Sequence, residues 1–226
     1  SADGPSLGQI IEDPGVINVC PWLSSVGGTT GTFRVTNIDT TEQFCYIQDA
    51  IDDASDGDTI GVGPGTYNEK LELRTPNITV QSTDGRDVTI LDVPEGNLTT
   101  GVKLLADMGT VTFDGFTVKD FTEGGIIQGM SASTSVFHVL NNKVIPAADY
   151  LRNGIQVTGD GSTVIGNFVE GAYLTEDWAS TAIGVVNASN ALVQYNEVSG
   201  AVNGIDTGIA VYTWGDITAS GTDVLD

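Results

Sequence analysis

Residues 142–169, NKVIPAADYLRNGIQVTGDGSTVIGNFV, contain one full period of a repeat that runs through the second half of the chain. The repeat has two columns, and successive members of each column are 25 to 29 residues apart. The first column aligns four valines, together with the residues two positions before them: Val118, Val144, Val169 and Val198, with Phe116, Asn142, Asn167 and Asn196. The second aligns apolar runs that begin at Gly125, Gly154, Ala182 and Gly208. A period of this size indicates one supersecondary unit stacked on the next.

Each unit consists of short alternating strands separated by Gly, Asn, Asp and Ser turns, with no helical pattern between them. The sequence therefore predicts an all-β protein, a parallel β-helix of six or seven coils. Alternate apolar side chains point inward, and neighbouring coils stack about 4.8 Å apart. We expect the asparagine column at 142, 167 and 196 to lie at a turn, adopt the left-handed conformation and form a hydrogen-bonded ladder.

One helix is predicted before the repeat, over residues 46–54. Ile47, Ala50, Ile51 and Ala54 give it a single apolar stripe, with Asp49, Asp52 and Asp53 on the outward face. Residues 1–41 lack the repeat and are predicted to form an extended N-terminal arm with one or two strands. The β-helix domain is assigned to residues 42–226.

Three runs around this helix resemble a known family: Ile47-Gln48-Asp49-Ala50-Ile51-Asp52, Gly57-Asp58-Thr59-Ile60 and Pro64-Gly65-Thr66-Tyr67-Asn68-Glu69. Together they resemble the opening of a right-handed parallel β-helix of the pectin-lyase-like superfamily, in which a short helix caps the first coil. The alternating runs at 78–82 and 88–92 resemble its second coil, and the resemblance covers roughly residues 42 to 215. It implies a fold rather than a function, because this fold serves lyases, hydrolases, adhesins and surface structural proteins.

The chain is strongly acidic, with 30 Asp and Glu against 8 Lys and Arg and a net charge of −22. Such a charge argues against nucleic acid or anionic membrane partners, and no apolar run is long enough to predict membrane insertion. Three interpretations stay open: a solvated acidic shell, adaptation to high salt, and Ca²⁺ binding by Asp-rich turns. No cofactor and no single metal site are predicted beyond this Ca²⁺ option.

Cysteines and sequons favour an extracellular or cell-surface location. Cys20 and Cys45 are the only two cysteines, and their spacing fits one disulfide in an oxidising compartment, with two free thiols as the alternative. Three Asn-X-Ser/Thr triplets, at Asn77, Asn97 and Asn187, are compatible with glycosylation.

Catalytic signals are sparse. A lyase of this fold needs basic side chains on adjacent coils, and the best candidates are His138 and Arg152. His138 is predicted to point outward, where Lys119 or an acidic neighbour one coil away would be within reach. The acidic motifs of the hydrolases are absent, and the pair Asp52-Asp53 is predicted to lie on the exposed face of the capping helix. The sequence therefore predicts no catalytic residue.

One segment departs from the repeat, at residues 171–178. Tyr173 and Trp178 flank Glu176 and Asp177, and such a set suits a sugar, whose ring stacks on an aromatic face while its hydroxyls bond to carboxylates. The alternative is that Trp178 folds back and covers the edge of a coil.

The leading hypothesis is an extracellular structural or adhesive surface protein without catalytic activity, able to assemble into filaments. Its expected partners are surface glycans or copies of itself, joined head to tail, because no capping segment follows Trp214 and the arm holds spare strand-forming patches. The alternative is a carbohydrate-active enzyme, a lyase or hydrolase, or a carbohydrate-binding module of the same fold.

Overall fold

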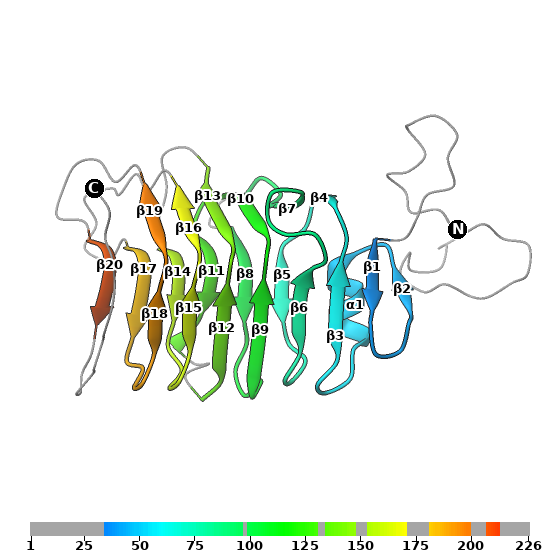
Figure 1. Cartoon of the computed structure of the whole chain (residues 1–226), viewed down its shortest axis with the longest axis horizontal. Coiled ribbons are helices and arrows are strands. Elements are labelled where there is room, and N and C mark those ends of the chain that lie inside the picture. Colours follow the sequence, from blue (N-terminus) through cyan, green and yellow to red (C-terminus); the bar gives the residue numbers. More distant parts are fainter. Residues whose placement is uncertain are drawn as a thin grey trace, which may run out of the picture.

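The computed structural model describes residues 34–96, 99–130, 134–147, 153–170, 181–199 and 207–212. These residues form a right-handed parallel β-helix whose coils stack along one axis (Figure 1). The described strands make six coils, and each coil contributes one strand to each of three sheets, called A, B and C below. The predicted all-β solenoid with one short capping helix is confirmed.

The strands are short, as expected for a structure that turns a corner every few residues. Across sheet A the order is β18 (Leu192–Gln194), β15 (Thr163–Ile165), β12 (Val136–Leu140), β9 (Thr110–Asp114), β6 (Thr79–Ser82), β3 (Thr59–Val62), β1 (Val35–Asn37) and β2 (Gln43–Phe44). Across sheet B it is β19 (Glu197–Ser199), β16 (Phe168–Glu170), β13 (Lys143–Pro146), β10 (Thr117–Phe121), β7 (Thr89–Asp92) and β4 (Gly65–Tyr67). Across sheet C it is β20 (Thr207–Tyr212), β17 (Thr181–Val186), β14 (Asn153–Val157), β11 (Gly124–Gln128), β8 (Thr100–Leu104) and β5 (Leu71–Leu73).

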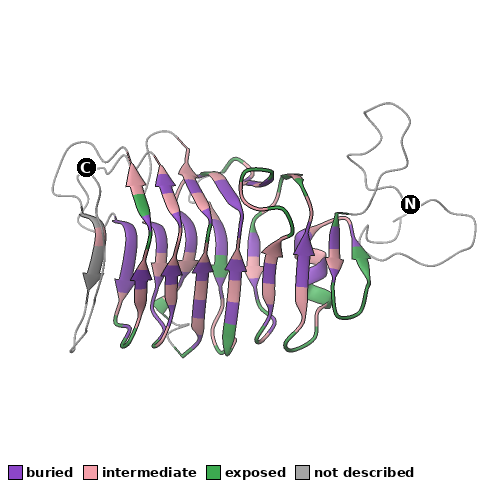
Figure 2. Cartoon of the chain, in the orientation of Figure 1, coloured by how far each residue is buried: buried purple, intermediate pink, exposed green. Residues whose placement is uncertain are grey.

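Both columns of the sequence repeat are columns of paired residues in space. In sheet B, Val118 pairs with Val144, Val144 with Val169 and Val169 with Val198. In sheet C, the register joins the isoleucines of the second column, Ile126, Ile155, Ile183 and Ile209. The inward side chains form one continuous hydrophobic core along the stack, and Figure 2 shows buried residues alternating with more exposed ones along the strands. The repeat period is therefore the length of one coil.

Two antiparallel strands begin the described structure, and β1 lies within the segment that sequence analysis assigned to the arm. Its residues Val35–Asn37 pair antiparallel with both β2 and β3, so they extend sheet A beyond the first coil. Residues 1–33 of the predicted arm lie outside the described residues. No described helix has the length and apolar character needed to cross a membrane.

The asparagine column forms the predicted ladder at the corner between sheets A and B. Asn142, Asn167 and Asn196 are buried, with 0%, 1% and 7% exposure. The side-chain oxygen of Asn196 accepts from the backbone N–H of Asn167 at 2.8 Å, and that of Asn167 accepts from Asn142 N–H at 2.9 Å. The first position is Phe116, whose backbone N–H donates to the Asn142 side chain at 2.9 Å. Hydrogen bonding along the column is therefore as predicted.

The backbone conformation of the ladder differs from the expectation. Positive φ angles fall on the residue before each column member, at Gly115, Asn141, Gly166 and Tyr195. Each corner is a two-residue turn between strands of sheets A and B, and its first residue makes the reversal in the left-handed region. The second residue is then free to direct its amide into the core. The prediction of a left-handed conformation for the ladder asparagines themselves was wrong by one position.

The capping helix α1 (Ile47–Asp53) buries Ile47, Ala50 and Ile51 against the first coil, as the apolar stripe predicts. Tyr46 at its N-cap makes no side-chain capping bond. The Glu69 carboxylate supplies the cap instead, because its two oxygens accept the backbone N–H groups of Ile47 and Gln48, both at 3.0 Å. The Glu of the Pro-Gly-Thr-Tyr-Asn-Glu run therefore joins the helix to the first coil.

Replacing Glu69 with glutamine should lower the free energy of unfolding by about 1 kcal/mol, since one of two capping acceptors is lost. Burial raises the pKa of the Glu69 carboxyl above its ordinary value of 4.5, although the two backbone hydrogen bonds oppose the shift. The protonated side chain therefore contributes stability below pH 4.5, and this contribution is lost as the pH rises through the folded-state pKa. The advantage of the wild type over Glu69→Gln should shrink between pH 4.5 and pH 7 in urea unfolding. An advantage that grows over this range would contradict the buried cap.

Only one of the two cysteines of the predicted disulfide lies within the described residues. Cys45 is disulfide-bonded, and Cys20, the only other cysteine of the sequence, lies outside the described residues. The Cys20–Cys45 pairing therefore stays a prediction. We expect alkylation of the denatured, unreduced chain to label no thiol, and reduction to lower the free energy of unfolding by about 3 kcal/mol. Two labelled cysteines in the unreduced chain would contradict the pairing.

Candidate functional site

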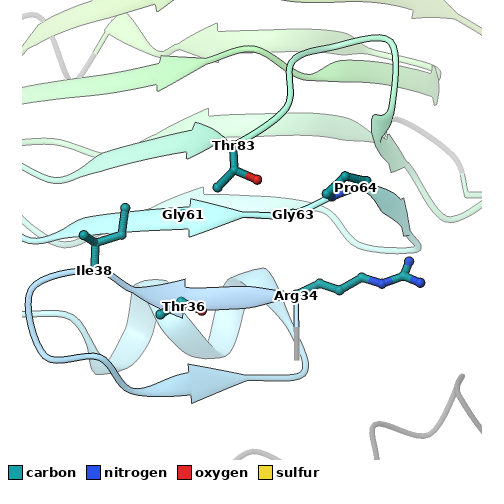
Figure 3. A pocket seen from close by; sticks show the side chains of 7 residues that line it. All are labelled: Arg34, Thr36, Ile38, Gly61, Gly63, Pro64 and Thr83. Carbon is teal, nitrogen blue, oxygen red and sulfur yellow. The ribbon is translucent and has the colours of Figure 1, made fainter. Parts of the chain in front are cut away.

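A groove lies at the N-terminal edge of the outward face of sheet A. It has a volume of about 480 Å³ and is lined by seven residues from β1, β3 and the segments that follow β3 and β6, shown in Figure 3: Arg34, Thr36, Ile38, Gly61, Gly63, Pro64 and Thr83. Sequence analysis did not single out this groove. The one signal for it was the run of glycines from Gly61 to Gly65, because glycines on the outward face of a strand leave the sheet surface bare.

Glycines form the floor of the groove, where a side chain would crowd Ile38 or Arg34. A Cβ atom at Gly61 would lie 3.0 Å from the Ile38 Cδ1 atom, and one at Gly63 would lie 3.3 Å from the Arg34 carbonyl oxygen. At Gly65 it would lie 2.6 Å from the Arg34 Nη1 atom. The Arg34 side chain thus lies against bare backbone at one end of the groove, while Ile38 forms the opposite end (Figure 3).

The lining residues suit binding rather than acid–base chemistry. Arg34 is exposed and offers guanidinium N–H donors. Thr83 adds a hydroxyl that is held by Asp84 at 2.6 Å, and Ile38, 47% exposed, adds an apolar wall. A ligand that matches this arrangement carries an anionic or hydroxyl group at one end and a flat apolar face next to it. A sugar ring with an acidic substituent has these properties.

A second, smaller cleft of about 240 Å³ opens on sheet C near the first two coils. It is lined by Lys70, Leu71, Glu72, Thr99, Thr100, Lys103 and Glu123. Its charges balance, because two lysines face two glutamates. Glu72 also forms an ion pair with Arg74 at 3.5 Å. This cleft is polar but presents no excess of either charge to a ligand.

The predicted sugar-binding segment lies between β16 and β17, where the chain passes from sheet B to sheet C. Tyr173, Glu176, Asp177 and Trp178 all lie outside the described residues. Both interpretations of this segment, a sugar site and a cover for the coil edge, therefore stay predictions. Arg152, one of the two weighed catalytic candidates, lies outside the described residues as well.

His138 points outward from sheet A, as predicted, between the buried residues Phe137 and Val139. Its Nδ1 atom lies 2.8 Å from the Thr163 hydroxyl on the next coil, and burial lowers the pKa of the imidazole. The expected meeting with Lys119 does not occur, because Lys119 lies on sheet B. His138 thus joins two coils through a hydroxyl, with no described carboxylate or lysine within ion-pair distance.

Outward lysines also join neighbouring coils. Lys119 on β10 pairs with Asp92 on β7 at 2.8 Å and with its neighbour Asp120 at 2.6 Å. The hydrogen bonds that its ammonium donates to Asp120 and to Asp92 raise the pKa of Lys119. Lys143 on β13 pairs with Glu170 on β16 at 3.0 Å. The Lys119–Asp92 and Lys143–Glu170 ion pairs therefore each link one coil to the next.

Carboxylates act mainly as hydrogen-bond acceptors at the coil corners. Asp52 and Asp53 lie on the exposed face of α1, as predicted, and Asp52 pairs with Arg74 at 3.1 Å. Asp58 accepts from the Asn37 side chain at 2.7 Å and from the Ser55 backbone at 2.8 Å. Among the described residues, no three acidic, histidine or cysteine side chains gather in a metal-binding group. Ca²⁺ binding by the chain stays a proposal.

The described residues thus form a parallel β-helix with a groove that ends at Arg34. No family model matches the sequence. A curated relative is the "Cell surface glycoprotein" of Methanothermus fervidus, 27% identical over 128 residues. The match covers 56% of this chain and 20% of the relative, so the chain spans about one fifth of the length of that protein.

Solved structures with a similar backbone are pectin methylesterases at 15% sequence identity. One is a pectin methylesterase in complex with a hexasaccharide, with a TM-score of 0.47 over 79% of this chain and 65% of that chain. Another is pectin methylesterase PemA from Erwinia chrysanthemi, with a TM-score of 0.46 over 77% of this chain and 64% of that chain. The likeness is one of general architecture.

Proposed function

We propose that this chain is a structural module of an extracellular or cell-surface protein, a rigid coil stack without catalytic activity. The observation that carries the proposal is that outward polar side chains join neighbouring coils. Lys119, Lys143 and His138 each contact a partner on an adjacent coil. The name of the Methanothermus fervidus relative supports a location at the cell surface.

A two-part experiment tests this function. Protease applied to intact cells that produce the protein should release peptides of the described coils, whereas peptides recovered only after lysis would contradict a surface location. Purified protein mixed with Ca²⁺ and polygalacturonate should form no unsaturated product, and mixed with methyl-esterified pectin it should release no methanol. Turnover would overturn the structural role in favour of the enzyme alternative.

Assembly into filaments and adhesion are finer parts of the proposal. The segments that suggested head-to-tail contacts, residues 1–33 and those after Tyr212, lie outside the described residues. Solution mass across protein and salt concentrations tests assembly, and deletion of residues 1–19 should abolish it. A single-chain mass at every concentration would exclude self-association.

A second candidate function is glycan binding at the groove beside Gly61 and Gly63. It is supported by the Arg34 guanidinium and by the bare glycine floor, which together fit the acidic substituent and the ring of one sugar. In this role the module attaches to an acidic surface polysaccharide and leaves it unchanged.

Replacing Arg34 with glutamine should weaken binding of polygalacturonate or dextran sulfate at least about tenfold, since a hydrogen bond to a charged group is lost. Arg74→Gln is the matched control, because it removes the same charge from an exposed side chain that pairs with Asp52 and Glu72 outside the groove. Calorimetry with each polymer, and with neutral dextran, measures the effect. An equal loss of affinity in both variants would mean that binding depends only on the net charge of the chain, and it would contradict a site at the groove.

A further inference from the structure

Two of the three sequons lie on described corners of the coil stack, and they use the asparagine amide differently. Asn77-Ile78-Thr79 leads into β6, and Asn187-Ala188-Ser189 follows β17. Both asparagines are exposed and both have positive φ, 54° and 52°. Asn97 lies outside the described residues.

The Asn77 amide is part of the corner structure. Its nitrogen donates to the Asp56 carboxylate at 2.7 Å, and its oxygen accepts the backbone N–H of Thr110 on the next coil at 2.8 Å. Gly109 is packed so closely that a Cβ atom there would overlap the Asn77 oxygen. A sugar on this nitrogen would replace one of its two hydrogens and would crowd both the Asp56 carboxylate and the corner of the next coil.

The Asn187 amide makes no hydrogen bond with any described residue, while its backbone is firmly held. Ala188 is 1% exposed and anchors the corner in the core. The Ser189 backbone N–H donates to Asp160 at 2.6 Å, and its carbonyl accepts from Gly161 at 2.8 Å. The sequon is thus presented with its asparagine and serine outward and the residue between them inward.

The equivalent corner of the preceding coil does not expose an asparagine in this way. Val157 and Val185 are paired, and two residues beyond them lie Gly159 and Asn187. Gly159 is buried against Ser135, where a Cβ atom would overlap the Ser135 carbonyl oxygen. The next coil places an exposed asparagine at the equivalent step. This corner therefore has room for a large substituent that the previous one lacks.

We propose that Asn187 is an N-glycosylation site of this protein and that Asn77 is left unmodified when the chain is folded. The proposal rests on the proposed function, since it requires an extracytoplasmic chain. The Asn187 Nδ2 atom attacks the anomeric carbon of a sugar carried by a lipid-linked phosphate donor. The N–C bond forms, the C–O bond to phosphate breaks with its electron pair leaving on the phosphate, and the Nδ2 proton passes to a base.

Peptide mass spectrometry of the full chain isolated from producing cells tests the proposal. The peptide containing Asn187 should carry a glycan mass, with occupancy at least about tenfold higher than at Asn77, because a sugar on Asn77 must disturb an amide that is held between Asp56 and Thr110. Ser189→Ala should remove this mass without touching the asparagine. Thr79→Ala, the matched change at the other sequon, should leave it unaltered.

Three results would overturn the inference: an unmodified Asn187 peptide, equal or higher occupancy at Asn77, or a glycan that persists in Ser189→Ala. The intact-cell protease experiment separates these from a failure of the proposed function. A surface-exposed chain with a bare Asn187 contradicts only the glycosylation site, whereas a chain released only by lysis contradicts the surface location.

Discussion

Replacing Gly159 with alanine should lower the free energy of unfolding by about 4 kcal/mol, the sum of an overpacking cost and a disrupted buried hydrogen bond. The added Cβ atom would overlap the Ser135 carbonyl oxygen and would lie 2.8 Å from the Gln128 Nε2 atom. Gln128 is fully buried, donates to that same carbonyl at 2.6 Å and accepts from the backbone N–H groups of Thr158 and Gly159. The peptide of Ser135 cannot move away without breaking this set of contacts.

Gly161→Ala is the matched control, two residues further along the same corner. Gly161 has φ +77° and no atom within 4 Å of the Cβ position, so alanine there meets only the left-handed backbone cost of about 1–2 kcal/mol. Urea unfolding followed by circular dichroism measures the stability of both variants. Hydrogen exchange should locate the effect in the strands from β11 to β15, which flank the corner. Equal destabilisation by the two substitutions would show that the Gln128 corner yields to an added methyl group.

Sequence periodicity predicts the later coils well because their lengths are nearly equal. In sheet B the pairs from Val118 to Val198 reproduce the aligned column residue by residue. The early coils could not be aligned by periodicity because their lengths differ. Thr59 pairs with Thr79 and Thr79 with Thr112, which are separations of 20 and 33 residues. There the resemblance to a known superfamily, and not the period, indicated the strands and the cap.

Contacts between distant residues that do not belong to the repeat were not predicted from the sequence. The pairing of β1 with β3 brings Arg34 to the glycines of the next strand, and only this antiparallel addition creates the groove. The Glu69 cap likewise depends on the first coil bringing that carboxylate back to the start of α1. The sequence shows glycines at positions 61 and 63, but only the fold brings Arg34 close to this glycine segment.

The ladder shows the same limit on a smaller scale. Alignment identified Asn142, Asn167 and Asn196 as equivalent and predicted their hydrogen bonds, because an amide can both donate and accept along a stack. The left-handed residue was assigned one position late, since the reversal falls on Asn141, Gly166 and Tyr195. These three residues share a positive φ angle but have different side chains, so alignment of the sequence did not identify them as equivalent.

Replacing Asn167 with alanine should be as damaging as the change at Gly159, lowering the free energy of unfolding by about 4 kcal/mol. The Asn167 Nδ2 group donates to the Val139 carbonyl at 2.8 Å and to the Asn196 side chain at 3.0 Å. Its Oδ1 atom accepts the Asn142 backbone N–H at 2.9 Å. Truncation leaves a buried carbonyl and a buried N–H without partners, and each costs about 1–3 kcal/mol in addition to the lost side-chain packing.

Asn167→Asp distinguishes the ladder from simple packing, because aspartate keeps the shape and the acceptor but cannot donate when ionised. It should be strongly destabilising at pH 7, with part of the loss recovered near pH 4, where a protonated carboxyl regains one donor. Asn141→Gly is the matched control at the adjacent, exposed corner position, where φ is 52° and glycine is tolerated. It removes a 3.0 Å surface contact with Asp114 and should change stability by less than about 1 kcal/mol. A pH-independent effect of Asn167→Asp, or a loss no larger than that of Asn141→Gly, would mean that the stacked amides do not hold the coils together.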